Sequence, residues 1–269
     1  MTPQADRVTR FRALHETGCF VIPNPWDAGS ARYLEMIGFA AVATTSSGFA
    51  WTLGKADTTV TLEEAVAHLE AISAAVSIPV NADFEGGFAV EPAGVAANVS
   101  RAVATGIAGI SIEDSTGDEA APLFEFDLAV ERIRAARAAI DASGTGVLLT
   151  GRSEGFIAGR PDLAETIRRL AAYADAGADC LYAPGLRSMA AISAVVAAVA
   201  PKPVNVLVNT DFTTVEDLAA LGVRRISVGG ALARAAWTGF IAAATEIAEH
   251  GTFTGLAVPS PELDRRFGG

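Results

Sequence analysis

Basic and nucleophilic side chains are scarce in this sequence of 269 residues. It contains two lysines, three histidines and two cysteines, and its 20 lysines and arginines stand against 31 aspartates and glutamates. The resulting formal net charge of −11 repels nucleic-acid phosphates and anionic membrane surfaces. We therefore expect neither a nucleic acid nor a membrane as a partner.

Long apolar runs are also missing. The first twenty residues scatter five charged side chains through what would have to be the apolar core of an export signal. The longest apolar stretch, residues 189–200, is too short to cross a bilayer. Cys19 and Cys180 lie far apart in apolar segments, which is typical of proteins in a reducing compartment. These absences predict a soluble, cytoplasmic protein.

Short apolar segments alternate with stretches of helical periodicity along the whole chain, the pattern of repeated βα units. The predicted strands cover residues 19–22, 40–44, 79–82, 109–112, 147–150, 180–183, 203–207 and 225–228. The predicted helices cover residues 30–37, 62–76, 92–105, 127–142, 162–176, 188–200, 214–221 and 231–249. Eight units without a glycine-rich dinucleotide loop favour a closed barrel over a doubly wound sheet. The sequence predicts an α/β fold, a single (β/α)8 TIM-type barrel over 1–269 with 250–269 as a C-terminal arm.

Local signals mark the boundaries of these units. Glycines expected to end helices in the left-handed conformation precede every second strand, at Gly38, Gly106, Gly177 and Gly222. Two capping boxes are predicted, Thr61 with Glu64 and Thr213 with Glu216, and two prolines suit first helical turns, Pro92 and Pro161.

Polar side chains gather at the carboxyl ends of the predicted strands, where the loops of a βα barrel meet at one mouth. These strand ends carry Asn24, Asp27, Ser46, Ser47, Gly48, Asp57, Asn81, Asp83, Glu85, Glu113, Asp114, Arg152, Glu154, Asn205 and Asn209. Any one of them alone could cap a helix or close a turn. Asp83 and Glu113, however, follow short buried strands, where charges need partners. Such carboxylates indicate a partly hydrated Mg²⁺ or Mn²⁺.

Arg152 is the cation that we place at this mouth. Its planar guanidinium would hold a substrate carboxylate or form a structural ion pair with Glu113, and the sequence leaves both interpretations open. The histidines and lysines lie away from these strand ends, in helical segments, the tail, a long loop or a strand start: His15, His68, His250, Lys55 and Lys202. Neither a histidine zinc site nor a Schiff-base lysine is expected.

Five segments, taken in order, resemble the isocitrate lyase and phosphoenolpyruvate mutase superfamily over nearly the whole chain. They are Asn24-Pro-Trp-Asp-Ala-Gly-Ser-Ala, Thr-Ser-Ser-Gly-Phe with Asp57 after it, Asn81-Ala-Asp-Phe-Glu-Gly-Gly-Phe, Gly109-Ile-Ser-Ile-Glu-Asp and Gly151-Arg-Ser-Glu-Gly-Phe. The resemblance implies a barrel with its last helix swapped between subunits and a homotetramer, or else a dimer. It also implies Mg²⁺-assisted chemistry through an enolate of a 2-oxo acid.

The resemblance implies a role for each matching residue. The predicted catalytic residues are Arg152, Glu113 and Asp57. The predicted substrate-binding residues are Trp26, Ser46, Ser47, Gly48, Phe49, Arg152 and Asn205. The predicted metal site consists of Asp83, Glu113, Asn81 and Asp57, with Asn81 standing where the family has an aspartate and so removing one negative charge.

The segment 114–126 departs from the lyases of this superfamily. It reads DSTGDEAAPLFEF and lacks the Lys-Lys-Cys-Gly-His loop whose cysteine delivers a proton. The gating loop of the mutase is absent as well, and Ala183 stands where the mutase has a histidine. We expect this segment to be a lid that supplies shape and no proton.

The function predicted from the sequence is a Mg²⁺-dependent carbon–carbon lyase acting beside a 2-oxo or 2-hydroxy carboxylate. Decarboxylation, retro-aldol cleavage and hydrolytic cleavage all fit this description. Two alternatives stay open: a C–P bond hydrolase or mutase acting on a phosphonate such as phosphonopyruvate, and a non-catalytic 2-oxo acid binding protein. The sequence identifies neither the substrate nor the proton donor.

Overall fold

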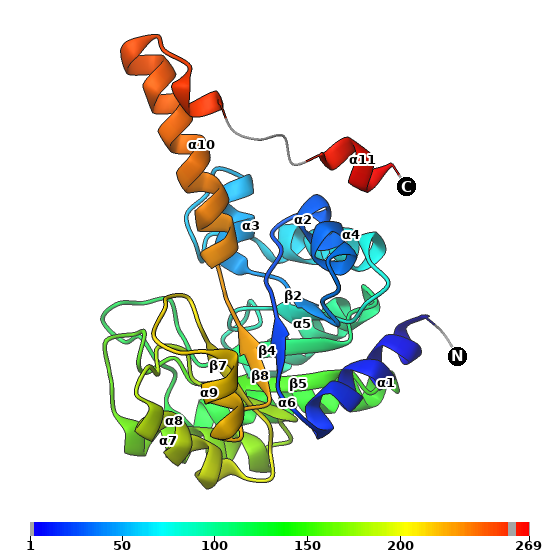
Figure 1. Cartoon of the computed structure of the whole chain (residues 1–269). Coiled ribbons are helices and arrows are strands. Elements are labelled where there is room, and N and C mark those ends of the chain that lie inside the picture. Colours follow the sequence, from blue (N-terminus) through cyan, green and yellow to red (C-terminus); the bar gives the residue numbers. More distant parts are fainter. Residues whose placement is uncertain (1–2, 258–261, 269) are drawn as a thin grey trace. The chain divides into compact units, whose positions relative to one another are not determined.

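The computed structural model describes residues 3–257 and 262–268, and its contacts divide the chain into two compact units, Met1–Gly230 and Ala231–Gly269. The first unit is built on eight parallel strands (Figure 1): β1 (Phe20–Ile22), β2 (Val42–Ala43), β3 (Val80–Asp83), β4 (Gly109–Glu113), β5 (Leu148–Arg152), β6 (Cys180–Tyr182), β7 (Val204–Leu207) and β8 (Arg225–Ser227). They pair in the order β1-β8-β7-β6-β5-β4-β3-β2. A hydrogen bond of 3.0 Å from Ala43 N to Pro23 O joins the two ends of this row. The predicted (β/α)8 barrel is confirmed.

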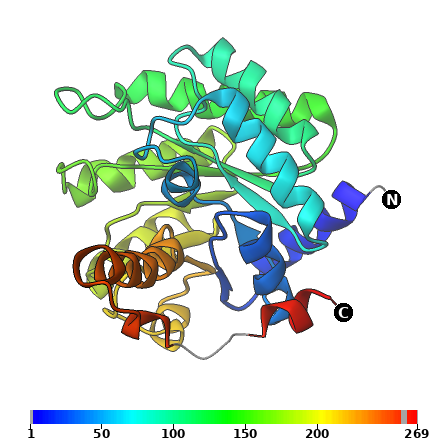
Figure 2. The same ribbon diagram turned by 90° about the horizontal axis from the view of Figure 1, so that it is seen from above.

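Helices alternate with these strands and surround them (Figure 2): α2 (Ala28–Met36), α4 (Leu62–Ala75), α5 (Pro92–Ala104), α6 (Phe126–Ser143), α7 (Leu163–Asp175), α8 (Met189–Val199) and α9 (Val215–Ala220). All seven match predicted helices to within two residues at either end. Two helices of this unit were not predicted, α1 (Pro3–Glu16) before β1 and α3 (Ser46–Thr52) after β2.

The local boundary signals are mostly confirmed. All four predicted helix-ending glycines have positive φ, between 85° and 103°. The capping box of Thr61 with Glu64 is present, and Pro92 lies in the first turn of α5. The box predicted at Thr213 and Glu216 is wrong, because the structure forms it one residue later, between Thr214 and Asp217. Pro161 is outside the first turn of α7, because Asp162 caps that helix and the helix itself begins at Leu163.

Helix α1 covers the amino-terminal end of the barrel. Its polar side chains donate hydrogen bonds to backbone carbonyls in the segments that lead into β3, β4 and β5. The bonds run from Arg7 to Val76 O (2.7 Å), from Gln4 to Ile107 O (3.0 Å) and from Arg12 to Gly146 O (3.0 Å). On the same face of α1, Phe11 is fully buried, and a Cβ at Gly109 would come within 2.5 Å of its ring. Gly109 therefore makes room for the aromatic side chain that closes this end.

The barrel interior next to α1 is polar and contains a buried arginine. Arg225 is 3% exposed and donates to Asn205 Oδ1 (3.0 Å) and Thr150 Oγ1 (3.0 Å). Its Nη1 lies 3.4 Å from Nε2 of His15. Burial, together with the charge of Arg225, lowers the pKa of His15 to about 3, so this ring is neutral at pH 7.

The neutral state of His15 makes the stability of the protein depend on pH. Because the unfolded chain takes up a proton near pH 6.5 and the folded chain only near pH 3, stability is complete above pH 6.5 and falls as the pH drops. The slope is about 1.4 kcal/mol per pH unit, so we expect a loss of about 2 kcal/mol between pH 6.5 and pH 5. Urea unfolding at both pH values should show that His15→Gln flattens this dependence. His250→Gln, which changes an exposed histidine, should leave it unchanged; an equal slope in all three proteins would contradict the prediction.

The second unit consists of α10 (Ala231–His250), the short 3₁₀ helix η1 (Thr254–Leu256) and α11 (Leu263–Phe267). Glu246 of α10 accepts hydrogen bonds from Thr252 Oγ1, Thr254 N and Gly255 N at 2.6 to 2.8 Å. These bonds fold the segment after α10 back onto the helix. Within the described residues, no helix has both the length and the apolar character needed to cross a membrane.

Candidate active site

A cavity of about 380 Å³ opens at the carboxyl ends of β3, β4 and β5. It is lined by Ser46, Asp57, Thr58, Glu85, Glu113, Ser115, Gly117, Asp118, Glu119, Pro122, Arg152, Glu154, Ile157 and Ala158. This mouth cavity thus combines the ends of neighbouring strands with the loop that follows β4. That loop is pinned by a bridge between Ser115 and Leu123.

Arg152, at the end of β5, is held by three carboxylates. Its Nε and Nη2 bind the two oxygens of Glu154 as a fork, with 3.1 Å between Nη2 and Oε2. Its Nη1 lies 3.1 Å from Oδ1 of Asp83 and 3.2 Å from Oε2 of Glu113. The guanidinium also lies 5.1 Å from the ring centroid of Tyr182. Arg152 therefore forms the ion pair with Glu113 that the sequence left open, and it also lines the cavity, where its binding of a substrate carboxylate stays a prediction.

Excess negative charge is the main electrostatic property of this site. Burial raises the pKa of Glu113 and of Glu154 even though both face Arg152. Burial and the charges of Asp83 and Asp57 raise the pKa of Glu85 to about 7. The pKa of Asp57 is also raised, mainly by burial and to a smaller extent by the charge of Asp83. Burial alone would lower the pKa of Arg152, but the surrounding carboxylates raise it. Several acids thus compete for one cation, and a second cation would be stabilised here.

The donor set fits a hydrated divalent cation better than a tightly coordinated one. Nowhere in residues 3–257 and 262–268 do three His, Cys, Asp or Glu side chains converge to hold a metal. Asp83 and Glu113 turn one oxygen each toward Arg152. Mg²⁺ commonly uses only one or two carboxylates and keeps several waters. The site therefore suits Mg²⁺ bound mainly through water.

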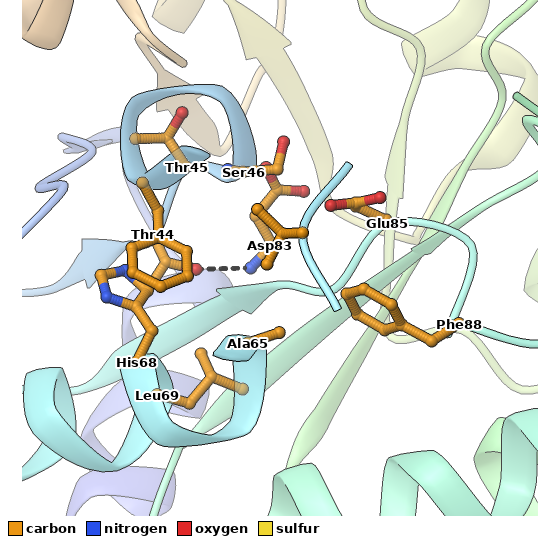
Figure 3. A pocket seen from close by; sticks show the side chains of 11 residues that line it. Thr44, Thr45, Ser46, Ala65, His68, Leu69, Asp83, Glu85 and Phe88 are labelled. Atoms are coloured by element: carbon orange, nitrogen blue, oxygen red, sulfur yellow. Dashed lines mark hydrogen bonds between the residues drawn. The ribbon is translucent and has the colours of Figure 1, made fainter. Parts of the chain in front are cut away.

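Asp83 is positioned by the segment that joins β2 to α3. Its backbone N–H donates to Thr44 Oγ1 (2.9 Å, Figure 3), and its Oδ2 accepts from the backbone N–H of Ser46 (3.0 Å). Thr45 caps α3 and orients this turn. Ser46, the first residue of the unpredicted helix α3, therefore lies directly beside Asp83.

Asp114 is a buried carboxylate that binds the backbone of Glu154, the partner of Arg152. Its carboxylate is 2% exposed and accepts hydrogen bonds from Glu154 N (2.8 Å), Arg169 Nη1 (3.1 Å) and Tyr173 OH (2.6 Å). It lies at the start of the predicted lid but outside the residues that line the cavity. Asp114 therefore fixes the loop that carries Glu154.

Some predicted site residues point away from the mouth cavity. The side-chain amide of Asn205 is used within the barrel, by Arg225 and by Ser227 Oγ (2.9 Å). The Asn81 side chain faces Gly109: its Oδ1 would lie 2.6 Å from a Cβ at that position, and it has no hydrogen-bond partner within the described chain. Trp26, Ser47 and Gly48 line none of the described cavities.

Asn24 links the ends of β1 and β8. Its Oδ1 accepts from Val228 N (2.9 Å) and Gly229 N (2.8 Å), and its Nδ2 donates to Thr44 O (2.9 Å). Asn24 thereby fixes the turn that follows β8.

Sequence reasoning placed Glu85 and Glu154 at the mouth but gave them no role. Glu154 follows Arg152 by two residues, and this spacing was the available signal for the fork between them. Glu85 has a positive φ of 46°, which few non-glycine residues adopt and which aims its side chain into the cavity mouth. No sequence motif indicated that Asp118 and Glu119 would line the cavity.

The fold and the site define a class: a (β/α)8-barrel enzyme with an acidic mouth built around one arginine. Residues 11–248 match the family model described as phosphoenolpyruvate phosphomutase. The chain therefore belongs to the phosphoenolpyruvate mutase family, within the isocitrate lyase and phosphoenolpyruvate mutase superfamily, and is a lyase-like enzyme of that superfamily.

Relatives with known structures or names agree with this assignment. A Burkholderia cenocepacia structure described as a candidate lyase or mutase is 47% identical, with a TM-score of 0.95 over 99% of this chain and 98% of that chain. A Bradyrhizobium diazoefficiens oxaloacetate decarboxylase is 32% identical over 67% of this chain and 64% of its own length. A phosphonopyruvate hydrolase in complex with oxalate and Mg²⁺ is 25% identical, with a TM-score of 0.85 over 100% of this chain and 95% of that chain.

Proposed function

We propose that this protein is a Mg²⁺-dependent lyase that cleaves a carbon–carbon bond beside the 2-oxo or 2-hydroxy group of a small carboxylic acid. The observation that carries the proposal is the mouth cavity, which is lined by Arg152, Glu113 and Glu154. Asp83 lies at its edge, with Oδ1 3.1 Å from Arg152 Nη1. The oxalate and oxaloacetate in the names of the relatives are acids of this size.

The residues of this chain would divide the work as follows. Asp83, Glu113 and Asp57 would hold the cation, which when bound stabilises negative charge on an enolate oxygen. Arg152, locked by Glu154, would present its guanidinium to the substrate in a fixed orientation, so little reorganisation is needed during the reaction. Ser46 and Phe49 would contact the substrate from α3. No direct contact with the substrate is proposed for Trp26, Ser47, Gly48, Asn81 or Asn205. They would act only by positioning the side chains that do contact the substrate or the cation.

Cleavage of a C–P bond is the second candidate, supported by the family match and by the phosphonopyruvate hydrolase. The charge of the cavity argues against it. Six carboxylates and one arginine line the cavity, which contains no lysine within the described chain. A phosphonate would add charge of the sign that is already in excess.

A substrate screen with purified protein tests the proposal. Oxaloacetate, a methylisocitrate-type acid and phosphonopyruvate should each be incubated with Mg²⁺ and, separately, with a chelator. We expect turnover of a carbon–carbon substrate that falls at least tenfold with chelator and returns on adding Mg²⁺. Turnover that ignores the chelator would reject the metal, and exclusive turnover of phosphonopyruvate would select the second candidate.

We propose further that the protein is a homotetramer, or a dimer, in which α10 is exchanged between subunits. In support, α10 carries large apolar side chains that are exposed in this chain, with Phe240 62% and Ile241 56% exposed. An exposed apolar helix face of this kind is typical of a surface that packs against another protein chain. Light scattering should give a multiple of the 27.6 kDa chain mass, and deletion from Ala231 onward should dissociate the assembly or make it insoluble. A monomeric mass for the intact chain would contradict the proposal.

A further inference from the structure

Arg132 of α6 is a buried cation that does not line the mouth cavity. Its side chain is 1% exposed. Burial lowers its pKa to about 10, so the guanidinium is still charged at pH 7. Arg132 forms no ion pair within the part of the chain that the structure describes. A buried charge costs solvation free energy unless other groups replace the lost water, so the hydrogen bonds of this guanidinium indicate its role.

The hydrogen bonds of Arg132 hold the loop that follows β3. Arg132 donates to three backbone carbonyls of this loop, and Asn98 of α5 donates to the two carbonyls in between. The five acceptors are, in chain order, Gly86, Gly87, Phe88, Ala89 and Val90. The bond from Arg132 Nη1 to the last of them is 2.7 Å long, and the bond from Asn98 to the second is 2.9 Å long. Two side chains thus bind every carbonyl of a five-residue segment.

This segment needs outside support because its backbone is strained. Glu85 and Phe88, whose side chains line the pocket in Figure 3, have positive φ angles of 46° and 54°. Residues with a β-carbon rarely adopt such angles unless the surrounding structure holds them there. Without the bonds from α5 and α6, we expect the loop to relax and to carry Glu85 away from the mouth cavity.

The same loop is bonded to the end of β4. Glu85 O accepts a hydrogen bond from the backbone N–H of Glu113 (3.1 Å), and the side chain of Glu113 lines the mouth cavity. Gly86 lies between Arg132 and the chain that follows β4, because a Cβ at Gly86 would come within 3.1 Å of Arg132 Nη2 and 3.3 Å of Ser115 O. A shift of the loop after β3 would therefore also move the backbone that carries Glu113.

Arg132 also contacts the loop that follows β4. Its guanidinium carbon lies 3.8 Å from the centroid of the Phe124 ring, a distance at which a cation is attracted to an aromatic face. The backbone N–H of Phe124 donates to Asp114 O (2.9 Å), and this bond joins the two ends of the loop. One buried cation thus holds both of the loops that follow β3 and β4.

We propose that Arg132 is a positioning residue for the reaction and that Asn98 assists it. Through the carbonyls of residues 86–90, the two side chains hold Glu85 in the mouth cavity and keep Glu113 opposite Arg152. Arg132 itself contacts neither the substrate nor the cation. The inference rests on the proposed function, because the positions that Arg132 fixes matter only if the reaction takes place in the mouth cavity.

Two substitutions test the proposal with the substrate that the screen identifies. Arg132→Lys keeps the charge, but a single ammonium cannot reach all three carbonyls. Asn98→Ala removes the other two bonds, and because Asn98 is only half-buried this variant should fold even if Arg132→Lys is unstable. Each variant should lower kcat per folded molecule at least about tenfold. KM should stay within about twofold, because the fork between Arg152 and Glu154 is intact.

Hydrogen exchange is a second measurement, which needs no substrate. The backbone amide of Glu113, which donates to Glu85 O, should exchange faster in both variants. Arg137→Lys is the matched control. Arg137 lies on the same helix, but it pairs with Asp179 (3.0 Å) in the segment that leads into β6, at the amino-terminal end of the barrel. Arg137→Lys should change neither kcat per folded molecule nor the exchange of the Glu113 amide.

Wild-type kcat per folded molecule in both Arg132→Lys and Asn98→Ala would overturn the positioning role and leave the proposed function standing. A rise in KM with kcat unchanged would also overturn it, and so would a fall in kcat that is equally large in Arg137→Lys. Unchanged exchange of the Glu113 amide in both variants would reject the route through Glu85. If the wild-type protein turns over none of the acids in the screen, the proposed function and this inference both fail.

Discussion

Arg152→Lys should reduce turnover at least 100-fold while the protein still folds. Lysine keeps the positive charge, but its single ammonium cannot bind both oxygens of Glu154 and also reach Asp83 and Glu113. The substrate would then face a charge that is no longer fixed in direction. The expected change is a large loss in kcat/KM, measured on the substrate found by the screen.

Arg152→Ala should have a different effect, because it leaves three buried carboxylates without their cation. We expect it to lower the free energy of unfolding by about 3–5 kcal/mol. Arg101→Lys is a matched control: Arg101 makes a similar fork with Glu63, but at a site where the arginine is 41% exposed. Because the pair is exposed to solvent, Arg101→Lys should leave both stability and turnover nearly unchanged. If Arg152→Lys loses turnover only in proportion to folded protein, Arg152 is a structural residue and not a substrate ligand.

Asp114→Ala should destabilise the fold by about 3–5 kcal/mol, because it removes the shared acceptor of Tyr173, Arg169 and the backbone of Glu154. The phenol of Tyr173 is fully buried and would lose the hydrogen bond that it donates to this carboxylate. Chemical denaturation of the variant beside the wild type measures this loss.

Asp118→Ala is the matched control in the same loop. Asp118 lines the mouth cavity and is exposed, and its Oδ1 accepts one bond from Ala120 N (2.9 Å). We expect it to raise KM with a change in stability below about 0.5 kcal/mol. Equal stability of the two variants would show that the network around Asp114 does not hold the loop in place.

The strands and most helices were predictable because their signals are local. Apolar periodicity, the helix-ending glycines and the capping box at Thr61 each depend on a few neighbouring residues. Where two registers satisfy the same rule, the sequence cannot choose: Thr213 with Glu216 and Thr214 with Asp217 have identical spacing, and the structure uses the second.

The unpredicted helices had weaker signals. Helix α3 has only seven residues, among them two serines, a threonine and a glycine, which are poor helix formers. Helix α1 buries only Val8, Phe11 and His15, so it has little apolar periodicity. Its position is fixed by hydrogen bonds to distant loops, which no local pattern reveals.

At the candidate site, the rule that reactive groups lie at the carboxyl ends of strands correctly brought together Asp57, Asp83, Glu113 and Arg152. The rule could not say how deep in the barrel each of these side chains lies. Asn81 lies two residues before Asp83 on the same strand, so it faces the same interior one layer lower, beside Gly109. The number of carboxylates that contact Arg152 could not be predicted from the sequence either, because it depends on the distances between three strand ends.

The docking of α1 has a consequence for how the chain folds as it is synthesised. This helix is made before all the strands of the barrel, yet its partners include the carbonyl of Gly146, 134 residues after Arg12, and Arg225, which is 210 residues from His15. More than half of the chain must leave the ribosome before α1 can bind its carbonyls, and nearly all of it before His15 meets Arg225. During that interval Phe11 has no barrel to close and remains an exposed aromatic group. Nascent chains halted before residue 146 should therefore be sensitive to protease within α1, and the amino-terminal helix should be among the last parts of the barrel to gain protection.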